Sequence, residues 1–182
     1  MHDQGAAAGS AFDPKLDHIR EAPSDQGRLE LIVRRPAQDE REILTSGRLD
    51  PALGLVGDRW ASRHIPSTPV FLAAQLTVIS TRLLAAIEPD RARWPLAGDQ
   101  LYVDFNLAEE TLPVGSCLAI GFALIEVSDE PHTGCAKFSA RFGSEALRWI
   151  NSPSGRANRL RGLNARVLQA GTIHVGDRVR RV

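Results

Sequence analysis

Several features that define other protein classes are missing from this chain of 182 residues. Its two cysteines, Cys117 and Cys135, give no disulfide framework. No apolar run approaches the ~20 residues of a membrane span, and the N-terminal residues lack the basic start and apolar core of a signal peptide. The formal net charge of zero creates no overall field that would attract nucleic acid. We therefore expect a reduced, cytoplasmic protein without a membrane or nucleic-acid partner.

Motifs of the common catalytic classes are also missing. No P-loop or GxGxxG follows an expected strand, the histidines form no HExxH or CxxC zinc pattern, and there is no GxSxG elbow. Lysine is scarce, because only Lys15 and Lys137 accompany the arginines among the 22 basic residues. Arginine binds phosphate and carboxylate as a planar fork, although genome composition also explains such a bias. The stretch from Arg156 onward, with Asp177 as its only acid, fits either an anion-binding segment or an exposed surface.

Strand patterns dominate what is present. In residues 101–107, Leu101, Val103, Phe105 and Leu107 alternate with polar residues, which predicts a half-buried strand whose apolar face points inward. The other predictions are a strand at 28–34 with Leu29, Leu31 and Val33 on one face, a strand at 75–80, a helix at 81–88, one bent or two short strands around Gly121, and two strands near the end divided by Gly171 and Gly176-Asp177.

About seven short strands and two helices without βαβ alternation predict a mainly β, barrel-like domain, largely antiparallel, with a few helices at its rim. We expect residues 1–27 to be a flexible N-terminal segment and residues 28–182 to form one domain. Gly-Asp occurs at Gly57, Gly98 and Gly176, each time before an expected strand, and we interpret these dipeptides as turns.

The stretch 131–150 contains the most reactive candidate, Cys135. Pro131, Thr133 and Gly134 predict a loop, and the apolar residues that follow at helical spacing predict a helix packed on the barrel: Phe138, Phe142, Ala146, Trp149 and Ile150. A cysteine just before a helix has a stabilised thiolate. His132, Lys137 and Arg141 add possible positive charge. The alternative is a buried structural thiol, which is also how we interpret Cys117 in its apolar segment.

A second candidate lies in Gly57-Asp58-Arg59-Trp60. Trp60 is expected in the core, whereas Arg59 either lines a pocket for an anion or is structural. A cysteine-protease mechanism with His132 as the base is disfavoured, because the base of a triad usually comes from a distant part of the fold. A thiol that acts as a sulfur nucleophile or as a ligand to a soft metal remains.

Six segments in a fixed order resemble the MOSC domain, the family of the molybdenum cofactor sulfurase C-terminal domain and its stand-alone bacterial relatives. They are GLVGDRW, QLTVIS, GDQLYVDFNL, LPVGSCLAIG, PHTGC and RGLNARVLQAGTIHVGD. The likeness runs from about Ile32 to Val182. It implies a β-barrel-like fold with one cysteine in a loop near the barrel mouth, and this position falls on Cys135.

The resemblance implies two activities. In one, the domain binds the molybdenum cofactor (molybdopterin), the Cys135 thiolate ligates molybdenum, and N-hydroxylated compounds are reduced. Carried over by motif, the cofactor-binding candidates are Arg59 for the pterin phosphate, together with Asn106, Arg161 and Asn164, and we add Arg141 as a cation beside the thiol. His132 and Lys137 would assist Cys135 in catalysis as thiolate stabilisers. In the other activity, Cys135 carries sulfane sulfur as a persulfide to a metal–sulfur cofactor.

Both activities imply partners. The sequence contains no stretch that resembles a pyridoxal-phosphate desulfurase domain, so a persulfide would come from a partner cysteine desulfurase that holds the pyridoxal phosphate. A reductase would need a flavin or iron–sulfur electron donor. A non-catalytic binding module is the third alternative, and the sequence predicts no oligomeric state.

Overall fold

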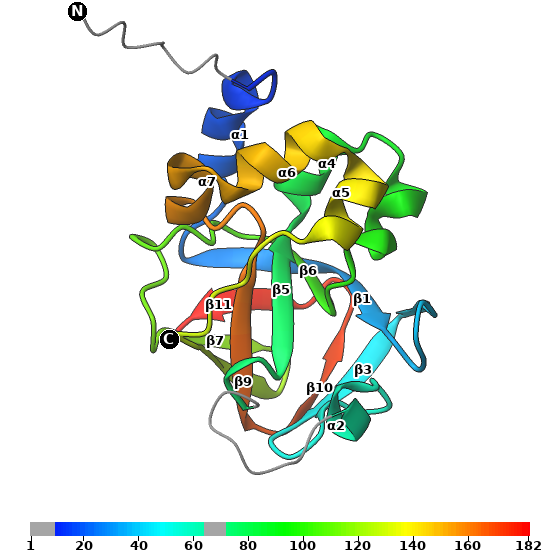
Figure 1. Cartoon of the computed structure of the whole chain (residues 1–182). Helices are drawn as coiled ribbons and strands as arrows, with labels where there is room; N and C mark the ends of the chain where they lie inside the picture. Colours follow the sequence, from blue (N-terminus) through cyan, green and yellow to red (C-terminus); the bar gives the residue numbers. More distant parts are fainter. Residues whose placement is uncertain (1–9, 64–71) are drawn as a thin grey trace, which may run out of the picture.

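Seven strands in the described part of the chain, residues 10–63 and 72–182, close into a barrel in the computed structural model (Figure 1). Strand β11 pairs with both β7 and β1, and this closes the sheet. The strands in order around the barrel are β11 (Arg178–Arg181), β7 (Cys117–Ile120), β8 (Ala123–Val127), β9 (Leu163–Gln169), β5 (Leu76–Ser80), β6 (Leu101–Asp104) and β1 (Gln26–Arg34). The β5–β6 pair is parallel, whereas the other neighbours in the barrel are antiparallel. The predicted barrel-like fold is confirmed.

Two smaller β structures extend the barrel. Strand β2 (Glu42–Leu44) pairs with the end of β1. A separate sheet of β10 (Gly171–His174), β3 (Ser46–Asp50) and β4 (Gly54–Leu55) lies with α2 (Trp60–Arg63) at the lower end in Figure 1. The C-terminal part therefore has three strands, β9 to β11, where the sequence predicted two. Gly121, with a φ of +53°, separates β7 from β8, which confirms the alternative of two short strands.

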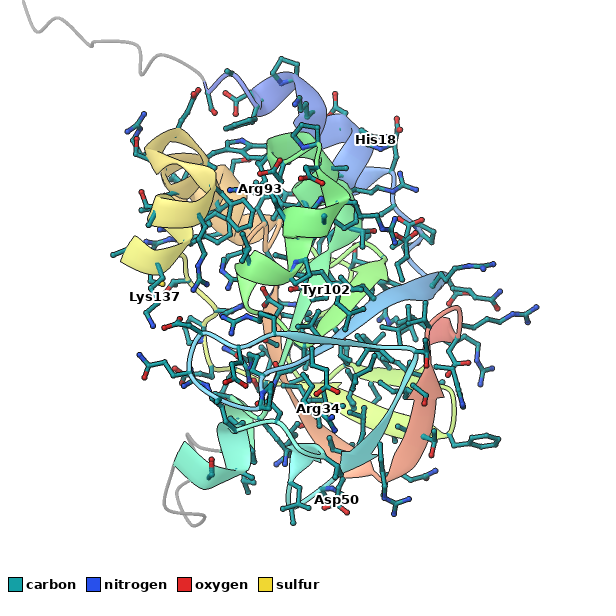
Figure 2. All side chains as sticks on the ribbon, turned by 90° about the vertical axis from the view of Figure 1, so that its right-hand side faces the viewer. His18, Arg34, Asp50, Arg93, Tyr102 and Lys137 are labelled. Carbon is teal, nitrogen blue, oxygen red and sulfur yellow. The ribbon has the colours of Figure 1, made fainter. Side chains whose placement is uncertain are left out.

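The barrel interior follows the alternation that the sequence predicts. Leu101, Val103, Phe105 and Leu107 are buried in one apolar cluster inside the barrel. The sequence predicted that the opposite face would be exposed. It is covered instead, since Tyr102 is fully buried in a second apolar cluster under the helices. Figure 2 shows Tyr102 inside the molecule. This strand is thus covered on both faces.

Apart from α2, the helices of the described residues gather at the upper end of the barrel in Figure 1. They bury the second apolar cluster, which includes Leu83, Trp94, Tyr102, Phe138 and Trp149. These segments are η1 (Asp13–Lys15), α1 (Leu16–Arg20), α4 (Thr81–Ile87), η2 (Arg91–Ala97), α5 (Ala136–Phe142), α6 (Ser144–Asn151) and α7 (Pro153–Ala157). The rim is more helical than the two helices that the sequence predicted.

Residues 1–27, expected to be flexible, contain structure from Asp13 onward. Residues 1–9 lie outside the described residues. Helix α1 buries Ile19, and Ala22 is buried just after it. Strand β1 begins at Gln26, two residues before the predicted start. The domain boundary at residue 28 stays a prediction.

Two local predictions are wrong in detail. The apolar face of residues 138–150 belongs to two helices, because Gly143 adopts a φ of +91°, which is outside the helical region and favours glycine. In β1, Leu29, Leu31 and Val33 do not share a face. The pairing with β6 shifts register between Leu29 and Leu31, so Leu29 points into the barrel and Val33 lies under the helices.

Candidate functional site

The residues before β6 form an acceptor segment, Leu96–Asp99, on which distant cations converge. Three consecutive carbonyl oxygens each accept a hydrogen bond from a different arginine. The pairs are Leu96 with Nη1 of Arg141 at 2.8 Å, Ala97 with Nη2 of Arg161 at 3.1 Å, and Gly98 with Nη1 of Arg35 at 2.9 Å. Gly98 has a φ of +87°, a conformation that favours glycine. This turn thus positions arginines from α5, from the end of β1 and from the turn before β9.

Asp99 completes the acceptor segment with a fully buried carboxylate. Its Oδ1 accepts a hydrogen bond from Nε2 of His132 at 2.8 Å, and its Oδ2 accepts one from Nη1 of Arg161 at 2.7 Å. Arg161 also lies over the Phe138 ring, with its Cζ 5.2 Å from the ring centroid. Through these two hydrogen bonds, Asp99 connects the loop before Cys135, which contains His132, to the turn before β9, which contains Arg161.

Electrostatics favour an ionised Asp99 and a neutral His132. Burial acts to raise the pKa of Asp99, but Arg161 and the hydrogen bond from His132 outweigh it and leave the pKa below its usual value. Burial, followed by the charge of Arg161, lowers the pKa of His132. From the sequence we expected His132 to place a positive charge near the thiol, but a neutral His132 supplies none. Its role as a thiolate stabiliser stays a prediction.

Cys135 is exposed and is the N-cap residue of α5. The pKa of its thiol is lowered, first by the backbone N–H of Phe138, then by the backbone N–H of Lys137, and further by the charges of Arg161 and Arg141. Desolvation opposes these effects only in part. Because Cys135 is exposed, the alternative of a buried structural thiol is excluded.

Lys137 and Arg141 reach Cys135 in different ways. The Lys137 side chain is 63% exposed, and its Nζ lies 4.0 Å from Oδ1 of Asp39. Figure 2 shows Lys137 at the outer surface. Its backbone N–H, rather than its ammonium group, acts on the thiol. Arg141 is more buried and binds Leu96 and Asp39 while its charge acts on Cys135.

Arg59 belongs to a group of arginines that also contains Arg35, Arg41 and Arg141. Burial lowers the pKa of Arg41, and the positive charges of Arg141, Arg35 and Arg59 lower it further. Arg35 is neutralised by the fully buried Asp58, with its Nη2 2.8 Å from Oδ1. Within the described residues, the buried Nε atoms of Arg41 and Arg59 have no hydrogen-bond partner. We call these four residues the arginine cluster.

Asn106 and Asn164 have structural partners. The side chain of Asn106 donates to the carbonyl of Arg20 at 2.9 Å and accepts from the N–H of Ala108 at 3.0 Å, so it fixes α1 to the end of β6. Asn164 donates to the carbonyl of Glu130 at 3.1 Å and thereby fixes the loop that leads to Cys135. Neither interacts with the arginine cluster, and their cofactor-binding roles stay predictions.

The loop before Cys135 lines a cavity of about 310 Å³. The loop 128–133, the end of α6 and the second half of α7 form its sides, and residues within 159–164 form a further wall. His132 and Arg161 line it, whereas Cys135 does not. Arg161 therefore contributes to both the cavity and the electrostatics of the thiol.

Two important residues, Asp58 and Asp99, were not predicted, although a signal for them was present in the sequence. Both follow glycine in the Gly-Asp dipeptides interpreted as turns, and both glycines do adopt positive φ values. The aspartates are nevertheless buried and hold Arg35 and Arg161. An acid after a turn glycine, in a chain rich in arginine, was the available clue. Arg41 has no comparable sequence signal.

The described residues contain neither a metal-binding cluster nor a membrane-spanning helix. In residues 10–63 and 72–182, no group of three or more His, Cys, Asp or Glu side chains is arranged to hold a metal ion. The helices in the same ranges are all too short or too polar to cross a membrane.

Solved structures share the fold at low sequence identity. YiiM from Geobacillus stearothermophilus has a TM-score of 0.61 and 16% identity, and the match covers 86% of this chain and 75% of that chain. YiiM from Escherichia coli has a TM-score of 0.56 and 20% identity, with 85% and 69% covered. YuaD from Bacillus subtilis has a TM-score of 0.57 and 16% identity, with 85% and 94% covered.

Two further similarities are found in the sequence itself. A stretch of 62 residues is 43% identical to mouse tubulin polyglutamylase TTLL11, and it covers 34% of this chain and 8% of that protein. So short a part of TTLL11 carries no activity over to this chain. The family model described as the MOSC domain matches residues 69–180, which include β5 to β11 and the Cys135 loop. The barrel, its order of strands and this match agree, and the chain belongs to the MOSC domain family.

Proposed function

We propose that the protein binds the molybdenum cofactor, with the Cys135 thiolate as a ligand of molybdenum, and that it reduces N-hydroxylated compounds. The observation that carries this proposal is the placement of an exposed thiol with a lowered pKa next to the arginine cluster. A soft thiolate suits a thiophilic metal, and guanidinium forks suit a phosphate. Arg141 links the two kinds of group, because its charge acts on both Cys135 and Arg41.

The donor set fits a metal that arrives with its own organic ligand. A bare ion would need several protein ligands, and the described residues offer no such group. A pterin supplies further sulfur ligands itself, so a single thiolate from the protein is sufficient. The residues that would hold it are Cys135 for the metal and Arg59 and Arg41 for the phosphate.

The charges of the arginine cluster support an anionic ligand. Arg41 is repelled by Arg35, Arg59 and Arg141, and only Arg35 and Arg141 have carboxylate partners. A phosphate bound by the guanidinium groups of Arg41 and Arg59 would reduce this repulsion. Arg161, which the sequence assigned to the cofactor, is held by Asp99 and acts on the thiol through its charge.

The cofactor, when bound, would supply the two-electron chemistry. Reduction of an N-hydroxy group takes up two electrons and two protons, breaks the N–O bond and releases water. The electrons would come from a partner that carries a flavin or an iron–sulfur cluster. The residues of this chain keep Cys135 ionised and orient the phosphate.

Metal analysis of protein purified from a host that makes molybdopterin tests the proposal. The parent and Cys117→Ser should contain about one molybdenum per chain, whereas Cys135→Ser should lose at least about tenfold, because a hydroxyl stays protonated and is a hard ligand. Arg59→Met should also lose molybdenum, and the matched control Arg166→Met, on an exposed strand position, should not. Equal molybdenum in Cys135→Ser and the parent would contradict the proposal.

A persulfide carrier is the second candidate, favoured by the exposure of Cys135. In this reaction the thiolate attacks the outer sulfur of a persulfide on a partner cysteine desulfurase, the S–S bond of that persulfide breaks, and the partner leaves as a thiolate. Pyridoxal phosphate would remain in the partner. Protein-bound sulfane sulfur on Cys135 without molybdenum would support this candidate and refute the first.

A further inference from the structure

We propose that the cavity behind the Cys135 loop is a binding site for an uncharged organic molecule with an O–H or N–H donor, and that Nδ1 of His132 is the acceptor that recognises it. The site rests on the geometry around His132. The choice of an N-hydroxylated amidine as the ligand rests on the proposed function, since such a molecule carries both kinds of donor.

Asp99 determines which nitrogen of His132 carries the proton. The carboxylate is ionised and can only accept hydrogen bonds, so Nε2, at 2.8 Å from Oδ1, must be the protonated nitrogen. The other oxygen of Asp99 is occupied by Arg161, a donor that cannot become an acceptor. His132 is neutral, and its Nδ1 therefore presents a lone pair.

This lone pair is available to the cavity. Within residues 10–63 and 72–182, Nδ1 of His132 has no hydrogen-bond partner, and it is not among the buried polar atoms that lack one. The His132 side chain is 15% exposed and lines the cavity. The ring is thus held in place through Nε2, whereas Nδ1 can accept a hydrogen bond from a ligand.

The cavity suits a small neutral molecule. Its volume of about 310 Å³ is at the lower end of the range for small-molecule sites. Three arginines and three acids line it, so the formal charges of the lining cancel: Arg156, Arg159, Arg161, Glu109, Asp129 and Glu130. Pro131, Ile150 and Leu163 add apolar surface. A lining with no net charge does not select an ion, and the acceptor at His132 selects a donor.

The cavity and the thiol share structural elements. Thr133 lines the cavity two residues before Cys135, and Asn151, which also lines it, holds Gly134 with two hydrogen bonds. Arg161 lines the cavity and acts on the thiol by its charge. A ligand here would lie next to the loop that carries the reactive sulfur.

Nitrogen NMR of protein labelled in its histidines tests the site directly, with benzamidoxime as the probe. In the free protein, His132 should show a protonated Nε2 and an unprotonated Nδ1. Benzamidoxime should shift the Nδ1 resonance of His132 while His18 and His174, which do not line the cavity, stay unchanged. An unshifted His132 at saturating probe, or a proton on Nδ1 in the free protein, would overturn the inference.

Two tryptophan variants provide a matched comparison by calorimetry. Val114 is 57% exposed and lines the cavity, and Val175 is 43% exposed and does not line it. Val114→Trp should block the cavity and weaken benzamidoxime binding about tenfold or more, equivalent to the loss of at least one good hydrogen bond. Val175→Trp should bind like the parent. Equal binding by the two variants would refute the site.

Cys135→Ser separates this inference from the proposed function. The variant should lose molybdenum but bind benzamidoxime as the parent does, because Cys135 does not line the cavity. If no variant or parent retains molybdenum and His132 still responds to benzamidoxime, the proposed function fails and the site stands. If molybdenum is retained and His132 does not respond, the site fails alone.

Discussion

The two cysteines of this chain lie in contrasting surroundings. Cys135 is exposed at the start of α5, and the backbone N–H groups of Lys137 and Phe138 lower the pKa of its thiol. Cys117 begins β7, is partly buried, and its sulfur contacts only the carbonyl of Gly115 at 3.8 Å among the hydrogen-bonding groups of the described residues. Cys135 thus lies at the start of a helix, whereas Cys117 lies on the face of β7 opposite the buried side chains of Leu118 and Ile120.

Backbone hydrogen bonding explains the difference. The first N–H groups of a helix have no partner within the helix, so they are free to bind a thiolate at the N-cap. In β7, the backbone groups are used by the neighbouring strands, and Cys117 lies opposite Glu126 of β8. The charges of Arg161 and Arg141 also lower the pKa of Cys135. Single substitutions can remove these differences one at a time.

Removing Arg161 should have the largest effect. Arg161→Met leaves the fully buried Asp99 without its cation and should lower the free energy of unfolding by about 3–5 kcal/mol. The pKa of Cys135 should also rise, because one of the stabilising charges is gone. Urea titration and thiolate absorbance measure the two effects. The control Arg166→Met breaks an exposed pair and should cost within ~1 kcal/mol, and equal costs would show that Asp99 is not the critical partner.

Phe138 is buried in α5, the helix whose N-cap residue is Cys135. It is 2% exposed and packs on Arg161 and Phe142. Phe138→Ala should therefore lower the free energy of unfolding by about 3–5 kcal/mol. Phe142 is only partly buried, so Phe142→Ala should cost less than this range, which applies to a fully buried phenylalanine. Denaturant titration of both variants checks the order, and a larger loss for Phe142→Ala would contradict the packing described here.

Titration of Cys135 measures the contrast between the thiols directly. In Cys117→Ser protein, thiolate absorbance should report an ionisation below the ~8.5 of a free thiol. Since the folded pKa is lower than the unfolded one, the unfolded chain binds more protons between the two values. The free energy of unfolding should therefore rise with pH across that interval, and it should lose this rise in Cys135→Ser. A Cys135 pKa above the free-thiol value would refute the reactive-thiol assignment.

Lys137 should have the smallest effect. Lys137→Ala keeps the backbone N–H that lowers the pKa of the thiol and removes a side chain that is 63% exposed. The pKa of Cys135 should hardly change, whereas Arg141→Met should raise it because the Arg141 charge acts on the thiol. Absorbance titration of the two variants compares them. A larger rise for Lys137→Ala would mean that the ammonium group, rather than the backbone, stabilises the thiolate.

Patterns of short range were sufficient for much of the fold. The alternation from Leu101 to Leu107 correctly predicted the barrel interior, and the helical spacing from Phe138 to Ile150 correctly predicted a buried face. The same patterns were insufficient where one residue changes the geometry. The register shift after Leu29 and the positive φ of Gly143 each alter the direction of the chain without changing its apolar pattern.

The sequence by itself determined where Cys135 lies, because a cysteine between a loop and a helix has the backbone N–H groups of its own neighbours beside its sulfur. Only the tertiary structure decided which charges surround it. Arg161 lies 26 residues after Cys135 and Asp99 lies 36 before it, and they meet because the barrel brings the turn before β6 next to the turn before β9. A local pattern encodes the hydrogen bonds within one segment. The partner of a buried charge depends on which segments the closed barrel places side by side.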